Sequence, residues 1–290
     1  MSGGGMRCAY GAGALLAIAE QYKVAEPDIL IAASGSAGNS AYYLSEQWES
    51  AANIWIQGVT SPKFISFRRR QVLDVDYLID EIFKKQHPFN IEKIKSKKTK
   101  WLLPVTRVRD GATVYLSPKR TEKVYEYLRA AKATPIAYGK TVTIDGEEYI
   151  DGDFGSETDD LVRRAIEEGA DDIVVIENNP GIGLGKKTRR LILRGLEIEE
   201  IFRKKTGLAK AMTRELKEHQ KLALPPEVRM VTLTPSKRLA VSVVSRKKLI
   251  LRTAFNAGYA DARDNKELKE LLQQGVPAMP SRTVRKARRR

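Results

Sequence analysis

Residues 28–44 read DILIAASGSAGNSAYYL, an apolar run that breaks into small residues and continues as a helical pattern. The run at 29–33 has the length of a buried strand, and the spacing over 37–52 predicts a helix. A strand that turns through small residues into a helix is typical of a nucleophile elbow, whose pattern is Gly-x-Ser-x-Gly. This stretch is therefore the first candidate for a catalytic site.

The elbow pattern fits best with Ser36 at its centre, in the frame Ser34-Gly35-Ser36-Ala37-Gly38. Ser34 takes the place of the first glycine, and the small residues Gly35, Ala37 and Gly38 let the strand and the helix cross closely. The Ser36 hydroxyl is then expected near the helix N-terminus, where unpaired N–H groups favour negative charge. The same residues also fit an ordinary strand-to-helix turn with a serine cap.

Strands and helices alternate along the rest of the chain. Strands are predicted at 101–107, 113–117, 172–177, 228–234 and in a hairpin at Asp145-Gly146, and helices at 11–21, 75–83, 120–131, 161–168 and 247–274. This alternation predicts an α/β fold with a mainly parallel central sheet covered on both faces. We expect one domain over 1–275, with an insert at 62–100, a basic helical segment at 188–222 and a basic tail at 276–290.

Composition narrows the cellular setting and the partners. The 290 residues carry a net charge of +15, which favours polyanionic partners, either an anionic membrane or nucleic acid. No apolar stretch has the length of a membrane span, the N-terminus lacks the regions of a signal peptide, and the lone Cys8 suits a reducing compartment. We therefore predict a cytoplasmic protein, with peripheral membrane contact through the basic helices and the tail.

Two further segments could take part in chemistry. Gly3, Gly4 and Gly5 place consecutive unhindered N–H groups before a helix, with Arg7 close behind, and such a nest can hold an oxyanion. Asp151 ends a predicted strand and opens an irregular segment that no hairpin explains. Neither His87 nor His219 adjoins a strand end, so neither is favoured as a base.

The order of these motifs resembles the patatin-like phospholipase family. The resemblance rests on GGGMR before a helix, the serine elbow, and KATPIAYGKTVTIDGEEYIDGDF followed by AIEEGADDIVVIE, and it spans roughly residues 3–262. It implies a three-layer α/β/α fold and a Ser36–Asp151 dyad without histidine, with Gly152 in the aspartate motif. It further implies an oxyanion hole from Gly3, Gly4 and Gly5 with Arg7 nearby. The implied activity is hydrolysis of acyl esters of phospholipids or other lipids.

Three departures from the family pattern motivate a second hypothesis. Cys8 replaces a glycine of the oxyanion loop, Asp153 adds a carboxylate beside Asp151, and only Met1 and Ser2 stand where the family has a strand. Either the native start lies upstream or the sheet lacks that strand. The alternative function is a weak or inactive binding module at anionic membrane surfaces.

The remaining patterns favour no other class of protein. Nucleic-acid binding ranks last because clustered aromatic residues and a known module are lacking. No His/Cys/Asp cluster has metal-ligand spacing, and the glycine-rich stretch at 178–188 fits neither phosphate-loop pattern. We therefore expect neither a metal nor a cofactor.

Overall fold

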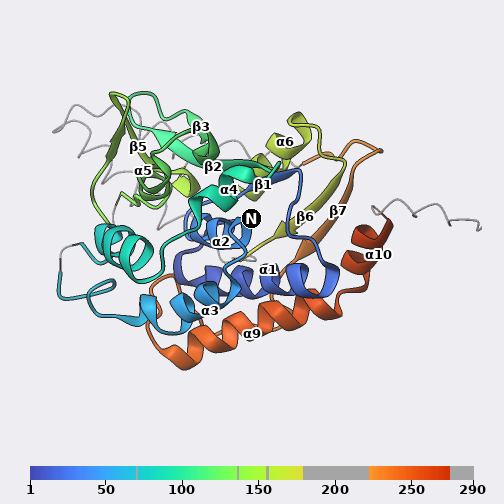
Figure 1. Cartoon of the computed structure of the whole chain (residues 1–290), viewed down its shortest axis with the longest axis horizontal. Coiled ribbons are helices and arrows are strands. Elements are labelled where there is room, and N and C mark those ends of the chain that lie inside the picture. The colour runs from blue at the N-terminus through green and yellow to red at the C-terminus, as the bar shows by residue number, and fades with distance from the viewer. Residues whose placement is uncertain (70, 136, 155–156, 179–221, 275–290) are drawn as a thin grey trace, which may run out of the picture.

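The computed structural model describes residues 1–69, 71–135, 137–154, 157–178 and 222–274 (Figure 1). The predicted tail at 276–290 lies outside these residues. So does the basic segment predicted at 188–222, except for residue 222. The strands are β1 (Ile29–Ile31), β2 (Lys100–Arg107), β3 (Thr113–Leu116), β4 (Val142–Ile144), β5 (Glu147–Asp151), β6 (Asp172–Ile176) and β7 (Arg229–Leu233).

The helices mostly follow the predicted segments. They are α1 (Ala9–Tyr22), α2 (Ser36–Leu44), α3 (Trp48–Ile56), α4 (Ile91–Ser96), α5 (Val124–Ala130), α6 (Thr158–Glu167), α9 (Lys248–Asp264) and α10 (Lys266–Gln274). A π-helix spans Tyr77–Gln86 in the insert, and 3-10 turns occupy Gly5–Cys8, Gly58–Thr60, Pro118–Arg120 and Gly152–Phe154. No helix among the described residues has both the length and the apolar content needed to cross a bilayer.

The α/β class predicted from the sequence is confirmed, with a mixed set of strand pairs. β1 runs parallel to β2, and β6 runs parallel to β7. β2 also pairs antiparallel with β3 and β5, and β4 and β5 form the predicted hairpin. Asp145 and Gly146 both have positive φ at its turn, the conformation that two-residue hairpins require.

Residues 1 and 2 connect β1 with β6. The Met1 nitrogen donates to Ile31 O (2.8 Å), and Ala33 N donates to Met1 O (3.2 Å). On the other side Ser2 N donates to Ile176 O (3.0 Å). These two residues therefore make strand-like contacts between β1 and β6, where the resemblance implies a whole strand, and the glycine loop starts from a fixed point.

Alternate residues of the strands face two different cores. In β1 and the two residues after it, Leu30 and Ala32 join the main core, while Ile31 and Ala33 pack with Leu161 of α6. Successive residues of a strand point to opposite faces of the sheet, and here both faces are covered by apolar cores. All residues of this strand are therefore apolar, and the sequence shows one continuous apolar run. The sheet is thus covered on both faces, by α6 on one and by the layer of α1 and α9 on the other (Figure 1).

Helices α1 and α9 pack through glycines at their contact. A Cβ added to Gly13 would lie 1.9 Å from Phe255 O, and one added to Gly258 would lie 1.9 Å from Tyr10 O. The two backbones approach so closely that no side chain fits between them. These two helices form the lower layer in Figure 1.

Two predicted helices are each divided in the structure. The helix expected at 37–52 becomes α2 and α3 because Glu46 adopts a positive φ of 55°, which no helix accommodates. The helix expected at 247–274 becomes α9 and α10 because Asn265 is extended. The Asn265 side chain accepts a hydrogen bond from Leu268 N (2.7 Å), as a helix cap does.

Substitution of Gly258 tests the close packing of α1 and α9. Alanine favours a helix by about 1 kcal/mol over glycine, yet its methyl group would overlap the Tyr10 carbonyl. We expect Gly258→Ala to lower the free energy of unfolding by about 1–3 kcal/mol. Gly58→Ala is the control, because its added Cβ finds its nearest atom at 3.5 Å. Equal urea midpoints for the two variants would contradict the prediction.

Candidate active site

The turn after β1 holds Ser34 in a strained conformation. Ser34 has a φ of 50°, which is uncommon for any residue except glycine, and Gly35 then leads into α2. Such strain costs of order 1–3 kcal/mol and tends to cluster at functional sites. The residue at the apex of the elbow is therefore Ser34, two positions before the predicted Ser36.

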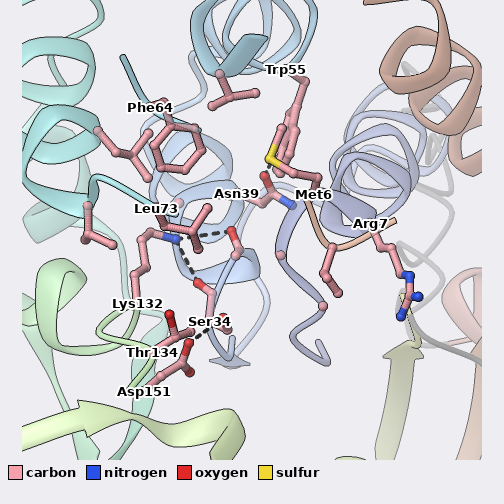
Figure 2. Close-up of a pocket in the computed structure, with 18 of the residues that line it drawn as sticks. Met6, Arg7, Ser34, Asn39, Trp55, Phe64, Leu73, Lys132, Thr134 and Asp151 are labelled. Carbon is pink, nitrogen blue, oxygen red and sulfur yellow. Dashed lines mark hydrogen bonds between the residues drawn. The ribbon is translucent and has the colours of Figure 1, made fainter. Parts of the chain in front are cut away.

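Ser34 is the serine that contacts Asp151. Its hydroxyl donates to Oδ2 of Asp151 at 2.6 Å (Figure 2). Asp151 is the last residue of β5 and lies opposite Val105 of β2, so the sheet fixes its backbone. Its second oxygen, Oδ1, accepts the N–H of Asp153 (3.0 Å). One carboxylate oxygen is thus held by the backbone while the other faces the serine.

Burial changes the proton affinity of Asp151. The carboxyl group is fully buried, and this loss of hydration raises its pKa to about 6. Hydrogen bonds from Ser34 and from the Asp153 N–H, together with the charge of Lys132, act in the opposite direction. The result is a carboxylate that remains ionised at neutral pH and is more basic than an exposed aspartate.

The predicted pair of Ser36 and Asp151 is not formed. Ser36 is fully buried at the start of α2, and its hydroxyl donates to Ser2 O at 2.7 Å. The same hydroxyl accepts a hydrogen bond from Nδ2 of Asn178 (3.0 Å), which also donates to Ser2 O (2.7 Å). Ser36 therefore anchors residue 2 and the end of β6 to the elbow. The position beside Asp151, which was expected for Ser36, is occupied by Ser34.

Asn178 completes this buried network. Its Oδ1 accepts the N–H of Gly11 in α1 (2.9 Å), and its own N–H donates to Ser2 Oγ (2.8 Å). Ser2 Oγ in turn donates to Glu177 (2.8 Å). The sequence analysis did not single out Asn178, whose only sequence signal is its position just beyond a buried strand.

The glycine loop lies against the elbow, as the sequence predicts. Gly4 and Gly5 both have positive φ, and a Cβ added to Gly35 would lie 2.7 Å from Gly5 O. Among the described residues, no hydrogen bond takes the backbone N–H of Gly4, Gly5 or Gly35 as its donor. These N–H groups can therefore receive an oxyanion. The Arg7 side chain points away from Ser34 and Asp151 (Figure 2).

The other predicted site residues have packing roles. A Cβ on Gly38 would meet the Phe83 ring at 3.0 Å, and one on Gly152 would meet Pro104 O at 2.3 Å. Ala37 is fully buried in the main core. Gly3 faces Asp153 closely, since a Cβ added there would lie 2.2 Å from the carboxylate oxygen Oδ2. These contacts require small side chains at the positions that the sequence pattern marked.

Among the described residues, Cys8 and Lys132 are buried titratable groups on whose pKa values the charge of Asp151 acts. Burial raises the pKa of the Cys8 thiol to about 12, so it remains protonated and unreactive. Lys132, which the sequence analysis did not single out, donates from Nζ to Ser34 O (2.7 Å) and Gly35 O (3.3 Å). Its signal in the sequence is a lone lysine among small residues, in AAKATP.

A cavity of about 560 Å³ opens onto Ser34 and Asp151. Gly4, Gly5, Gly35 and Lys132 also line it, whereas Ser36 does not. The rest of its wall is mainly apolar and is built from α3 and the insert, with Ile54, Trp55, Val59, Phe64, Leu73, Val75, Leu78 and Phe83 (Figure 2). Few polar groups at one end of an apolar cavity are typical of a ligand site.

The comparison with known families gives the class of the protein. The model of the Patatin-like phospholipase family matches residues 1–158, which include the glycine loop, the elbow and Asp151. This is more than half of the 290 residues, so the chain belongs to that family, whose members are in general lipid acyl hydrolases. A search among curated proteins found no match.

Substitution of Ser36 tests its structural role. Ser36→Ala removes a buried hydroxyl that serves Ser2 O and Asn178, and a buried polar group that loses its partner costs about 1–3 kcal/mol. We expect a loss of this size in the free energy of unfolding, measured by urea denaturation. Ser96→Ala is the control, since this exposed serine bonds only Lys93 O. A Ser36→Ala variant as stable as the control would disprove the anchoring role.

Proposed function

We propose that the protein hydrolyses acyl esters of lipids with Ser34 as nucleophile and Asp151 as general base. The observation that carries the proposal is the 2.6 Å hydrogen bond from the Ser34 hydroxyl to Asp151, at a strained elbow that faces the cavity. The proposed nucleophile thus differs from Ser36, which the sequence pattern favours.

The reaction follows from this contact. Ser34 Oγ attacks the ester carbonyl carbon, its proton passes to Asp151 Oδ2, and the carbonyl electron pair moves onto oxygen. The intermediate then expels the alcohol, which takes the proton from Asp151 and leaves the acyl group on Ser34. Water attacks this acyl-enzyme with Asp151 again as the base, and the fatty acid and free Ser34 are released.

The charge that develops on the carbonyl oxygen needs donors. We assign this role to the N–H of Gly35 and to those of Gly4 and Gly5, which the close approach of loop and elbow brings together. Gly3 and Arg7 complete the loop in this proposal. The acyl chain would occupy the apolar part of the cavity, toward Trp55 and Phe64.

A weak or inactive binding module is the second candidate, favoured by the position of Asp153. Its carboxylate lies against Gly3, at the start of the glycine loop. A negative charge near a developing oxyanion opposes catalysis. The same fold and cavity would then bind an acyl chain without cleaving it.

Labelling with a fluorophosphonate probe and turnover of p-nitrophenyl esters separate the candidates. We expect Ser34→Ala to abolish labelling and both Ser34→Ala and Asp151→Asn to reduce turnover by at least about a thousandfold, because each removes one partner of the proton transfer. Ser36→Ala should keep its labelling, at a reduced rate because the network that positions the glycine loop is weakened, and the exposed Ser96→Ala is the control for an unchanged rate. Labelling lost in Ser36→Ala but kept in Ser34→Ala would reverse the assignment, and a folded wild type without labelling or turnover would support the binding module.

We also propose peripheral contact with an anionic membrane at the mouth of the cavity. The basic segments predicted for this contact lie outside the described residues, but two described segments support it: the loop that holds Phe67, and the loop that leads into α9, with Leu249 in the first turn of that helix. Phe67 and Leu249 are 61% and 74% exposed. Arg246 stacks on the Phe67 ring at 5.5 Å and donates to Ile65 O (3.0 Å), which joins the loops. The cytoplasmic location remains a prediction from the cysteine content.

The charges of this surface suit acidic lipids. Arg68, Lys247 and Lys248 are exposed beside the apolar side chains, and the neighbouring Val243 is half exposed while it also lines the cavity. Apolar side chains ringed by cations bind bilayers by partial insertion together with electrostatic attraction. An acyl ester in the membrane would then lie next to the entrance.

Sedimentation with vesicles tests this membrane surface. We expect the double variant Phe67→Ser, Leu249→Ser to bind vesicles of phosphatidylserine and phosphatidylcholine at least about tenfold more weakly, while it hydrolyses a soluble ester at the wild-type rate. The exposed Leu224 does not line the cavity, so Leu224→Ser serves as the control. The proposal fails if the double variant and the control bind equally well.

A further inference from the structure

Lys132 is a buried lysine whose side chain donates its hydrogen bonds to the elbow. It is 7% exposed, and in the described part of the chain the two hydrogen bonds of its ammonium group go to carbonyl oxygens, those of Ser34 and Gly35. Figure 2 shows the ammonium group between these carbonyls, on the side of the cavity that also holds Asp151. A lysine is rarely buried to this degree without a role that repays the loss of hydration.

We infer that Lys132 is a positioning residue for the reaction proposed above: it holds the strained elbow by two carbonyls and supplies the positive charge that keeps Asp151 ionised. The inference rests on the proposed function. The carbonyl contacts fix the peptide units on both sides of the Ser34–Gly35 bond. They therefore set the direction of the Ser34 hydroxyl and of the Gly35 N–H that is assigned to the oxyanion.

The electrostatics of the site agree with this role. Burial lowers the pKa of Lys132 to about 8, while the negative charge of Asp151 acts against this shift. Burial raises the pKa of Asp151 to about 6, and the charge of Lys132 restrains that rise. Between about pH 6 and pH 8 both groups are therefore charged, and each stabilises the charge of the other.

Other titratable groups near the pair are Cys8, Asp153 and Arg7. The Cys8 thiol is neutral because of its high pKa. Asp153 binds Oδ1 of Asp151 through its backbone N–H, whereas Arg7 lines the cavity with its guanidinium turned away from Ser34 and Asp151. Lys132 is thus the cation whose charge lowers the pKa of Asp151.

The geometry argues against a different role, that of Lys132 as the base. A general base must receive the proton of the serine hydroxyl, so its lone pair must face Ser34 Oγ. Here Nζ donates to the carbonyl oxygen of Ser34, and the hydroxyl donates to Asp151. In the transfer of the proton from Ser34 Oγ to Asp151 Oδ2, Lys132 neither gains nor loses a proton.

The test is the pH dependence of kcat/KM for a soluble p-nitrophenyl ester, with fluorophosphonate labelling rates as a second readout. The wild-type rate should rise through about pH 6 as Asp151 ionises and fall through about pH 8 as Lys132 loses its charge. Lys132→Met should lower the rate at the pH optimum by roughly a hundredfold. The rise in rate on the acid side of the profile (the acid limb) should move up by about one pH unit. The fall in rate on the alkaline side (the alkaline limb) should disappear.

Lys132→Arg is the matched variant, because a guanidinium keeps both its donors and its charge at every pH tested. We expect Lys132→Arg to retain the acid limb near pH 6 and to lose the alkaline limb. If Lys132→Met does not fold, the profile of Lys132→Arg tests whether the charge of residue 132 sets the alkaline limb. If Lys132→Met lowered the rate but left the acid and alkaline limbs of the pH profile unchanged, the inference would be overturned. The role of Lys132 would then be structural only.

The outcomes also separate this inference from the proposed function. If Asp151→Asn kept full activity with a rate that rises through about pH 8, Lys132 would be the base and both proposals would fail. If Ser34→Ala and Asp151→Asn were inactive while the Lys132→Met profile matched that of the wild type, only the role of Lys132 would be lost.

Discussion

The buried hydrogen bonds among Ser2, Ser36 and Asn178 are the constraint on which the rest of the site depends. They connect the first residues of the chain, the elbow and the end of β6, three segments that are far apart in the sequence. The glycine loop begins directly after Ser2, so its distance from the elbow is set by this network. In a dry core each bond is costly to break, because the polar group left behind has no water to replace it.

The sequence locates the elbow but cannot choose between its serines. Ser34 and Ser36 are two positions apart among small residues, so either fits the centre of a strand-turn-helix pattern. What separates them is the positive φ of Ser34 and the burial of Ser36 against residue 2 and Asn178. Those partners come from distant parts of the chain, and local patterns carry no information about them. Asp151 stands out in the sequence because it ends a strand and its Asp-Gly pair is not the turn of a hairpin.

Much of the fold could be predicted from the periodicity of apolar residues in the sequence, but the helix boundaries could not. The apolar run before the elbow indicates a strand covered on both faces, and Leu30 and Ile31 indeed face different cores. The division at Glu46 depends on a single backbone conformation that its side chain does not dictate, and the cap that Asn265 provides falls inside a continuous helical pattern. The same holds for Lys132, which composition alone would place on the surface. In the structure it is buried, with its ammonium group bound to two carbonyls of the elbow.

In the proposed mechanism, a serine activated by a carboxylate alone faces an electrostatic conflict, which burial and charge resolve at this site. An exposed aspartate is too weak a base for a serine hydroxyl, while a buried and isolated one would hold its proton at neutral pH and could not accept another. Full burial raises the pKa of Asp151, and the charge of Lys132 together with the Asp153 N–H limits that rise. Because the ammonium group is bound to the elbow carbonyls, the charge that tunes the proposed base moves with the proposed nucleophile. Basicity and alignment are therefore coupled through one side chain.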